Sequence, residues 1–385
     1  MEQVSIPPSE RDPAPPTLDL LGDPVTLTAD LVDIPSPSGQ EKLIAEAVET
    51  SLRNLNLPGV EILRFNNNVL ARTQLNLPGR VILAGHLDTV PIADNVPGHR
   101  APNADGVDTL YGCGTVDMKS GLAVYLHTFA SLAGAGHERP TRDLTFIAYE
   151  CEEVEYHRNG LGHIQREHPE WLVGDLALLG EPTGAWIEAG CQGNLRIRVT
   201  AHGTRAHSAR GWLGDNAIHK LTPVMARIAE YGHQDVIIDG LTYREGLNIV
   251  RVEAGVANNV IPDEAWMSVN FRFAPNRSAE QATRHVIDVL RLEETPGVTW
   301  VLDDAAGGAL PGLDLEVTAG LVEAVGRDRV RAKFGWTDVS RFSAVGVPAL
   351  NFGSGDPSYA HKRDEQCPVG QITGVAEILH TYLTS

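Results

Sequence analysis

The fold class follows from the stretch Val81-Ile82-Leu83-Ala84-Gly85-His86-Leu87-Asp88, an apolar run that ends in a histidine and an acid. An uninterrupted apolar run of this length predicts a strand buried on both faces. Residues 119–132 then carry apolar side chains at helical spacing, and two more apolar runs follow at residues 144–149 and 176–179. Because strands and helices alternate, we expect an α/β fold with a mostly parallel mixed sheet flanked by helices.

The pattern changes near Gly190. Three segments then alternate between apolar and polar residues, as half-exposed strands do, and two segments have helical spacing. In chain order they are residues 194–201, 217–229, 248–253, 265–273 and 279–292. This order describes a small α+β unit with an exposed sheet edge. We therefore predict one domain in two parts, residues 1–190 and 306–385, and a second domain inserted at residues 191–305.

The composition excludes several classes of partner. The 385 residues include 50 acids and 31 bases, which gives a formal charge of -19. That charge repels nucleic acid and anionic membrane surfaces, so we expect neither as a partner. Four scattered cysteines without a CxxC pair suggest reduced thiols. The polar, proline-rich start lacks the pattern of a signal peptide, so we expect a cytoplasmic protein.

Candidate metal ligands come where predicted strands end. His86 follows the first strand, and Asp88, two residues on, points to the same side and can fix its tautomer. Asp117 lies in a glycine-rich stretch before a helix. Glu152 and Glu153 belong to four acids that repel each other unless a cation is present. One of these two glutamates could bind metal while the other handles protons.

Glu181, after residues 176–179, and His361, in a polar C-terminal segment, complete the set. Each segment alone also has an ordinary explanation, as a turn histidine, an N-cap aspartate or a solvated acidic loop. Together, two histidines and three carboxylates are the mixed nitrogen and oxygen ligand set of a two-metal hydrolase with one bridging carboxylate.

These segments give the chain a family resemblance over nearly its whole length. It resembles the acetylornithine deacetylase/succinyl-diaminopimelate desuccinylase family, which also contains aminoacylases and zinc carboxypeptidases. The motifs are GHLDTVP at 85–91, GTVDMKSG at 114–121, ECEEVE at 150–155, GEPT at 180–183, AHGTRAHSA at 201–209, NNVIPDEA at 258–265 and AHKRDE at 360–365. The resemblance implies a catalytic domain and an inserted lid domain through which two chains form a homodimer.

The resemblance also implies a centre of two zinc ions, for which cobalt or manganese can substitute. His86 and Glu181 would hold one ion, His361 and Glu153 the other, and Asp117 would bridge both. In this family arrangement the general base and acid is the remaining glutamate, Glu152. Asp88 would orient His86, and the peptide bond between Asp117 and Met118 would be cis.

Four residues of the predicted inserted domain match substrate-binding positions. His207 matches a histidine that reaches into the active site of the partner subunit. Asn258, Asn259 and Arg272 match positions that hold the backbone carboxylate of an N-acyl amino acid, and a planar guanidinium suits a carboxylate. For Arg272, a plain edge-strand charge is an equal alternative.

Within the family, residues 151–155, 158–162, 190–193 and 351–357 are most similar to the actinobacterial desuccinylases. This implies removal of succinate from N-succinyl-LL-2,6-diaminopimelate, on the route to lysine and cell-wall precursors. However, Cys191-Gln192 stands where other desuccinylases carry an arginine-containing segment, and Pro357 stands where they carry asparagine. The alternatives are acetylornithine deacetylase or another N-acyl-amino-acid deacylase or carboxypeptidase. A non-catalytic scaffold is disfavoured because all five ligands and Glu152 are present.

Overall fold

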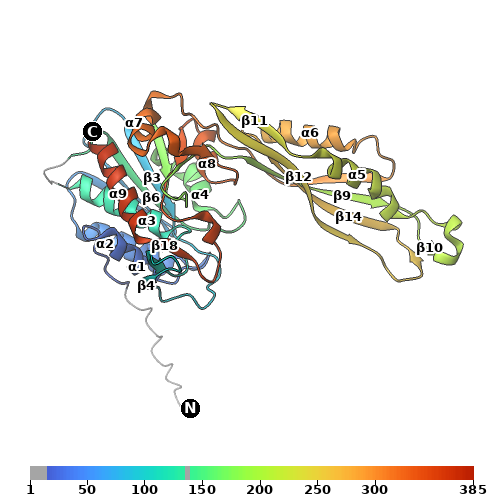
Figure 1. Ribbon diagram of the computed structural model, residues 1–385, viewed down its shortest axis with the longest axis horizontal. Coiled ribbons are helices and arrows are strands. Elements are labelled where there is room, and N and C mark those ends of the chain that lie inside the picture. Colours follow the sequence, from blue (N-terminus) through green and yellow to red (C-terminus); the bar gives the residue numbers. More distant parts are fainter. Residues whose placement is uncertain (1–14, 135–138) are drawn as a thin grey trace, which may run out of the picture.

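The computed structural model describes residues 15–134 and 139–385, which form two lobes joined side by side (Figure 1). Most of the N-terminal arm lies outside the described residues. An eight-stranded sheet with the strand order β1-β2-β6-β3-β7-β17-β8-β16 forms the centre of the larger lobe. Its strands are β1 (Val60–Phe65), β2 (Asn68–Thr73), β3 (Arg80–His86), β6 (Asp143–Tyr149), β7 (Leu176–Leu179), β8 (Ile187–Ala189), β16 (Val330–Ala332) and β17 (Ala349–Asn351).

The pairing in this sheet is mixed and mostly parallel. β3 is parallel to both β6 and β7, β17 is parallel to β7, and β16 is parallel to β8. The antiparallel pairs are β1 with β2, β2 with β6, and β17 with β8. The predicted fold class is therefore confirmed. A small sheet of β4 (His99–Pro102), β5 (Asp108–Tyr111) and β18 (Gln366–Pro368) lies beside it.

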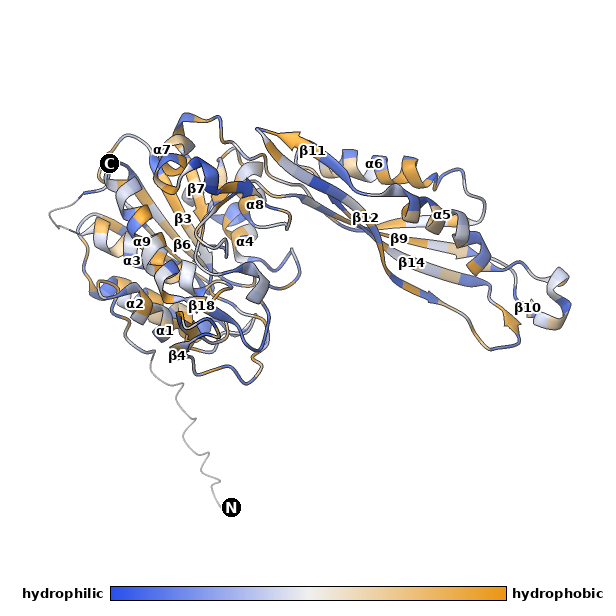
Figure 2. Ribbon diagram, in the orientation of Figure 1, coloured by the Kyte–Doolittle hydropathy of each residue, from blue (hydrophilic) through white to orange (hydrophobic). Residues whose placement is uncertain are grey.

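Helices cover both faces of the large sheet, which explains the continuous apolar strands. Successive side chains of β3 point to opposite faces, so Val81 and Leu83 join one core while Ile82 and Ala84 join the other. The first core includes α1 (Pro24–Val32), α2 (Lys42–Asn54), α3 (Lys119–Ala133), α7 (Glu316–Val325) and α9 (Val369–Thr384). The second includes α4 (Gly160–Glu167) and α8 (Val339–Ala344). Figure 2 shows the hydrophobic residues gathered on these central strands.

The smaller lobe is an antiparallel sheet in the order β11-β12-β14-β9-β15. Two helices, α5 (Ala217–Tyr231) and α6 (Ala279–Leu290), pack on one face and share its core. The strands are β9 (Gly193–His202), β11 (Gln234–Ile238), β12 (Leu241–Ala254), β14 (Glu264–Phe273) and β15 (Val298–Ala306). At its far end β10 (Ala206–His207) pairs with β13 (Val260–Ile261).

The sequence patterns missed two strands, β11 and β15, of the five-stranded sheet. β11 and the start of β12 form a hairpin whose turn residues Asp239 and Gly240 both have positive φ, of 49° and 77°. An Asp-Gly pair is a recognised hairpin signal. No strand was predicted where β15 lies, and its pairing with β9 runs from Val298 to Ala306. The predicted boundaries of the domains, near residues 190 and 305, stay a prediction.

Two further features concern the whole chain. None of the helices among residues 15–134 and 139–385 is both long and apolar enough to cross a membrane. All four cysteines are buried, and none of them forms a disulfide.

Candidate metal centre

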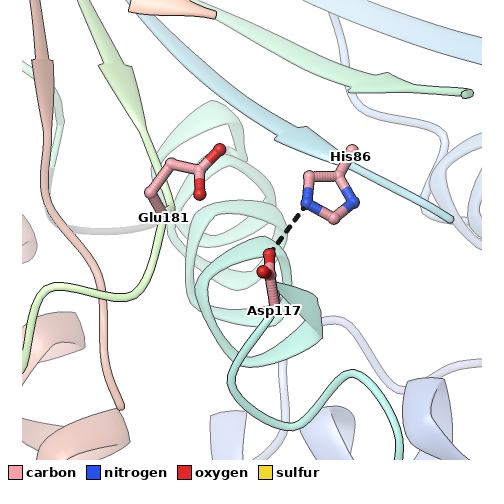
Figure 3. Close-up of side chains that lie close together, drawn as sticks. All are labelled: His86, Asp117 and Glu181. Atoms are coloured by element: carbon pink, nitrogen blue, oxygen red, sulfur yellow. Dashed lines mark hydrogen bonds and ion pairs between the residues drawn. The ribbon is translucent and has the colours of Figure 1, made fainter. Parts of the chain in front are cut away.

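The first part of the centre forms where β3 meets the start of α3. His86 is the last residue of β3, and its Nε2 lies 3.1 Å from Oδ1 of Asp117 (Figure 3). Asp117 immediately precedes α3, and the peptide bond between it and Met118 is cis. That prediction is therefore confirmed.

Glu181 approaches the same pair from the loop after β7 (Figure 3). This proximity depends on close packing, because a Cβ on Gly121 of α3 would lie only 1.8 Å from the carbonyl oxygen of Gly180. Ligand atoms of His86, Asp117 and Glu181 all lie within 4.8 Å of one another. Oε1 of Glu181 is buried, and no hydrogen-bond partner meets it in the part of the chain that the structure describes. A buried carboxylate oxygen left in this way is costly unless a cation or donor meets it.

The second part forms around the other oxygen of Asp117. Nε2 of His361 lies 3.4 Å from Oδ2 of Asp117 and 3.0 Å from Oε1 of Glu153. His361 comes from the loop before β18, where its φ is +64°. The ligand atoms of these three residues again lie within 4.8 Å of one another. Asp117 thus lies between the two histidines, as a bridging ligand must.

Glu152 and Glu153 follow β6, and both lie close to His86. Ligand atoms of His86, Glu152 and Glu153 form a third close group. By distance alone Glu152 could therefore bind metal as well, and geometry does not separate it from Glu153. The contact between Glu153 and His361 distinguishes the two glutamates, because no corresponding contact joins His361 to Glu152 among the described residues.

The protonation equilibria reflect the crowding of acids. Burial raises the pKa of Glu152, and the charges of Asp338, Glu181 and Glu153 raise it further against the opposing effect of His86. Burial and then the charge of Asp117 raise the pKa of Glu181 to about 7. Both carboxyls resist ionisation beside further negative charge, and a cation would relieve this.

The two histidines respond in the opposite way. Burial alone would lower the pKa of His86, but the hydrogen bond to Asp117 and the charges of nearby acids raise it well above its usual value. Hydrogen bonds to Asp117 and Glu153 raise the pKa of His361 to about 10. Burial would raise the pKa of Asp117, but its bonds to His361 and His86 lower it. Protons on the imidazoles therefore occupy positions that a metal ion would take.

Asp88 is placed differently from the prediction. Its carboxylate Oδ1 lies 3.6 Å from Nδ1 of His86, whereas the carbonyl oxygen of Asp88 lies 2.9 Å from that nitrogen. The carboxylate instead accepts the main-chain N–H groups of Glu152 at 2.9 Å and Glu153 at 3.1 Å, and the hydroxyl of Ser38 at 2.7 Å. Asp88 therefore orients His86 through its main chain and holds the acidic loop through its side chain.

Glu365 was missed by the sequence reasoning. Its buried carboxylate accepts the N–H groups of Gly114 at 2.9 Å, Val116 at 2.9 Å and Asp117 at 3.0 Å. It thereby fixes the loop that carries the bridging aspartate. The signal that could have found it is its place four residues after His361 in the same polar motif.

The predicted substrate-binding residues fall in two places. Arg272 is half-buried and lines an open pocket together with Glu152 and Glu153. His207, Asn258 and Asn259 lie on or beside β10 and β13, at the end of the smaller lobe farthest from the metal ligands (Figure 1). The structure thus brings Arg272 to the candidate centre of its own chain and leaves the other three away from it.

The donor set fits a pair of divalent cations. Two imidazoles and three carboxylates match the preferences of zinc, and Asp117 faces both halves. The unpartnered Oε1 of Glu181 is an independent sign that a ligand belongs there. The residues present therefore fit two metal ions with one bridging carboxylate.

Comparisons with known proteins agree with this geometry. Residues 82–385 match the sequence profile of Peptidase family M20/M25/M40. The chain is 70% identical over 369 residues to a succinyl-diaminopimelate desuccinylase of Corynebacterium glutamicum, covering 96% of this chain and 98% of that one. It shares the fold of a Staphylococcus aureus tripeptidase, with a TM-score of 0.75, 19% identity and 96% and 99% coverage. The same holds for a dinuclear metal-binding M20 peptidase of Bacillus subtilis, with a TM-score of 0.66, 17% identity and 94% and 96% coverage. By its sequence and its fold, the chain belongs to Peptidase family M20/M25/M40.

Proposed function

We propose that this chain hydrolyses the amide bond of N-succinyl-LL-2,6-diaminopimelate and releases succinate and the free amine. The observation that carries the proposal is the placing of Asp117 between two imidazole and carboxylate pairs, with Glu152 beside them. The identity of 70% to the Corynebacterium desuccinylase over nearly both whole chains supports the choice of substrate.

The ligands of two zinc ions would be His86 and Glu181 on one side, His361 and Glu153 on the other, and Asp117 between them. Bound zinc supplies Lewis-acid polarisation of the amide carbonyl and a water of lowered pKa. Cobalt or manganese would occupy the same oxygen and nitrogen donors. Every ligand except His361 is largely buried, which keeps competing water away.

Glu152 would carry the proton. Its carboxylate removes a proton from the attacking water and returns it to the nitrogen of the leaving amine as the carbon–nitrogen bond breaks. Asp88 keeps Glu152 in place through the main-chain N–H group.

Arg272 would bind a carboxylate of the substrate. Its side chain lines the pocket next to Glu152, and it makes no ion pair within residues 15–134 and 139–385. Burial lowers the pKa of the guanidinium, but that group remains charged at neutral pH, so it offers donors to an incoming carboxylate.

We further infer a homodimer formed through the smaller lobe. His207 and the two asparagines lie far from the metal ligands of their own chain, so they would serve the site of a partner (Figure 1). The adjoining segment exposes Trp212 and Leu213, at 78% and 62% of their surface. Exposed aromatic and aliphatic side chains of this size are typical of a subunit contact. Residues 191–305 would then act as lid and dimerisation domain in a cytoplasmic enzyme.

The experiment is a panel of N-acyl amino acids, scored by release of free amine. We expect zinc-loaded protein to hydrolyse succinyl-diaminopimelate with the highest kcat/KM. Acetylornithine is the critical contrast, because Cys191 is buried and the Gln192 side chain donates to the carbonyl oxygen of Arg244 at 2.8 Å. Neither residue offers a cation to a succinyl carboxylate. A preference for acetylornithine would replace the proposed substrate, and no turnover of any member would contradict the proposal.

A further inference from the structure

The acidic loop, defined as residues 150–160, is held closed at its base. The N–H of Gly160 donates to the carbonyl oxygen of Glu150 at 2.8 Å. Near the end of the loop, Oδ1 of Asn159 caps α4 by accepting the N–H of Leu161 at 2.9 Å. Between these points the loop carries Glu152 and Glu153. Their positions depend on what holds the outer side of the loop.

Asp338 and Arg341 hold the outer side of the acidic loop. The carboxylate of Asp338 is fully buried and accepts from Nδ2 of Asn159 at 2.8 Å and from Nε of Arg341 at 2.7 Å. Nη2 of Arg341 donates to the carbonyl oxygen of Tyr156 at 2.8 Å, and its guanidinium carbon lies 3.7 Å from the centre of the Tyr156 ring. Two side chains from the start of α8 therefore grip the loop at two points.

The same segment also contacts both connections between the lobes. Nε1 of Trp336 and Oγ of Ser340 donate to the carbonyl oxygen of Gly307, just after β15, at 3.1 Å and 2.7 Å. Sγ of Cys191, just before β9, lies 3.7 Å from the carbonyl oxygen of Thr337. The segment that grips the acidic loop is thus attached where the chain enters and leaves the smaller lobe.

Stability alone does not account for this arrangement. A buried ion pair pays for its own desolvation and is often no more stabilising than apolar packing of the same volume. The contacts made by Asp338 and Arg341 instead converge on one loop. Asp88 holds the N–H groups of Glu152 and Glu153 from the other side. The loop is therefore fixed between two carboxylates that do not themselves belong to the metal ligand set.

We propose that Asp338 and Arg341 are positioning residues that set the place of Glu152 and link it to the connections between the lobes. This inference rests on the proposed function of Glu152 as the proton carrier. Asp338 lies outside the pocket that Arg272 and Glu152 line, whereas Arg341 forms part of its wall, so a rise in KM equal to the fall in kcat would make Arg341 a substrate-binding residue and overturn its positioning role. Loss of the grip lets the loop sample other positions, which lowers the fraction of chains in which Glu152 can reach the attacking water.

The test compares Asp338→Asn and Arg341→Lys with the parent enzyme, all zinc-loaded. Lysine keeps a charge next to Asp338 but cannot also reach the Tyr156 carbonyl with a second donor of fixed geometry. We expect kcat to fall about 10–100-fold, as displaced catalytic groups do, while KM changes less than about threefold. Hydrogen exchange should become faster in peptides that cover residues 150–160. Zinc content should stay at the parent value.

The chain offers a matched control in Glu245→Gln. Glu245 is equally buried, pairs with Nε of Arg277 at 3.0 Å and accepts the N–H of Ala274 at 3.0 Å, but it belongs to the smaller lobe. This variant should lose thermal stability and keep its kcat and the exchange rate of the acidic loop. An equal fall of kcat in Glu245→Gln would reduce the effect to general destabilisation and overturn the proposal.

The remaining outcomes separate this inference from the proposed function. If the parent enzyme hydrolyses none of the acyl substrates, the proposed function fails, and the exchange data still test the grip on the loop. If the parent is active but Arg341→Lys keeps both kcat and slow exchange, the inference alone fails. If Asp338→Asn does not fold, Arg341→Lys decides the question.

Discussion

Replacing Glu152 by glutamine separates proton transfer from metal binding. The amide keeps the size of the side chain and removes its ability to take a proton. The main-chain N–H of residue 152 still donates to Asp88, so the loop keeps its position. If Glu153 is the ligand that accompanies His361, the variant should still bind two zinc ions.

The magnitude follows from the role. A positioned general acid or base contributes about 10²–10⁴ in rate, which corresponds to about 3–5 kcal/mol of transition-state stabilisation. Although Glu152→Gln lowers the catalytic rate, it should raise the stability of the metal-free protein. Burial raises the pKa of the Glu152 carboxyl in the folded protein above its value in the unfolded chain. As pH rises past the unfolded-state pKa, the unfolded chain ionises first, and the folded state loses stability relative to it. Glutamine removes that cost, and at neutral pH the metal-free variant should have the higher Tm.

Three measurements on one preparation check this reasoning. Zinc content per chain is determined by elemental analysis, kcat by release of amine, and Tm of the metal-free forms at pH 4 and pH 7.5. The gain in Tm should be present at the higher pH and become much smaller at the lower one, where the wild-type carboxyl is mostly protonated in both states. A nearly fully active variant would refute the assignment of the base. Loss of one zinc ion would show instead that Glu152 is a ligand.

Three other perturbations give distinct results. Glu365→Gln should cost about 1–3 kcal/mol of stability, because an amide N–H₂ would face the N–H of Gly114 inside the protein, and chemical denaturation measures this. Zinc binding should release protons and weaken as pH falls, because hydrogen bonds raise the pKa of His361 to about 10 and keep it protonated in the metal-free protein. Calorimetry in buffers of different ionisation enthalpy detects this proton release. A binding enthalpy that does not depend on the buffer would contradict the prediction. Mixing the Glu152→Gln and His207→Ala variants under conditions that exchange subunits should restore about a quarter of the wild-type rate. Half of the dimers would be mixed, and each mixed dimer would contain one intact site of its two. No recovery of activity would mean that His207 does not serve a partner.

The sequence predicted residues of the metal centre because parallel strands end at one edge of a sheet, where side chains that follow different strands meet. His86 and Glu181 each follow a buried apolar strand, and buried strands are easily recognised. The ends of parallel strands meet at one edge of the sheet, so residues distant in the chain converge there. The acids that follow β6, another strand of this sheet, also lie close to His86.

The sequence was less informative where contacts join residues far apart in the chain and where the apolar pattern of a strand is weak. The bonds from Glu365 to residues 114–117 span about 250 positions, and no local periodicity reveals them. Asp88 was expected to use its carboxylate on His86, but the ring nitrogen meets the carbonyl oxygen, and the carboxylate was left for the acidic loop. β15 was missed because four of its nine side chains are exposed and it ends in two acids and two alanines.

The carboxylates around the centre differ in how their charge is satisfied, and this decides which of them can bind metal. Asp88 and Glu365 are buried and accept from main-chain N–H groups, and Asp338 accepts from an amide and a guanidinium. Such donors stabilise a carboxylate in place and leave it little affinity for a cation. Within residues 15–134 and 139–385, Oε1 of Glu181 receives no donor, and the carboxylate of Asp117 contacts only imidazoles that a metal can displace. The donors therefore separate carboxylates that hold loops from carboxylates that remain available as ligands. Removal of a loop-holding carboxylate should disturb geometry before metal content, whereas removal of a ligand should do the reverse.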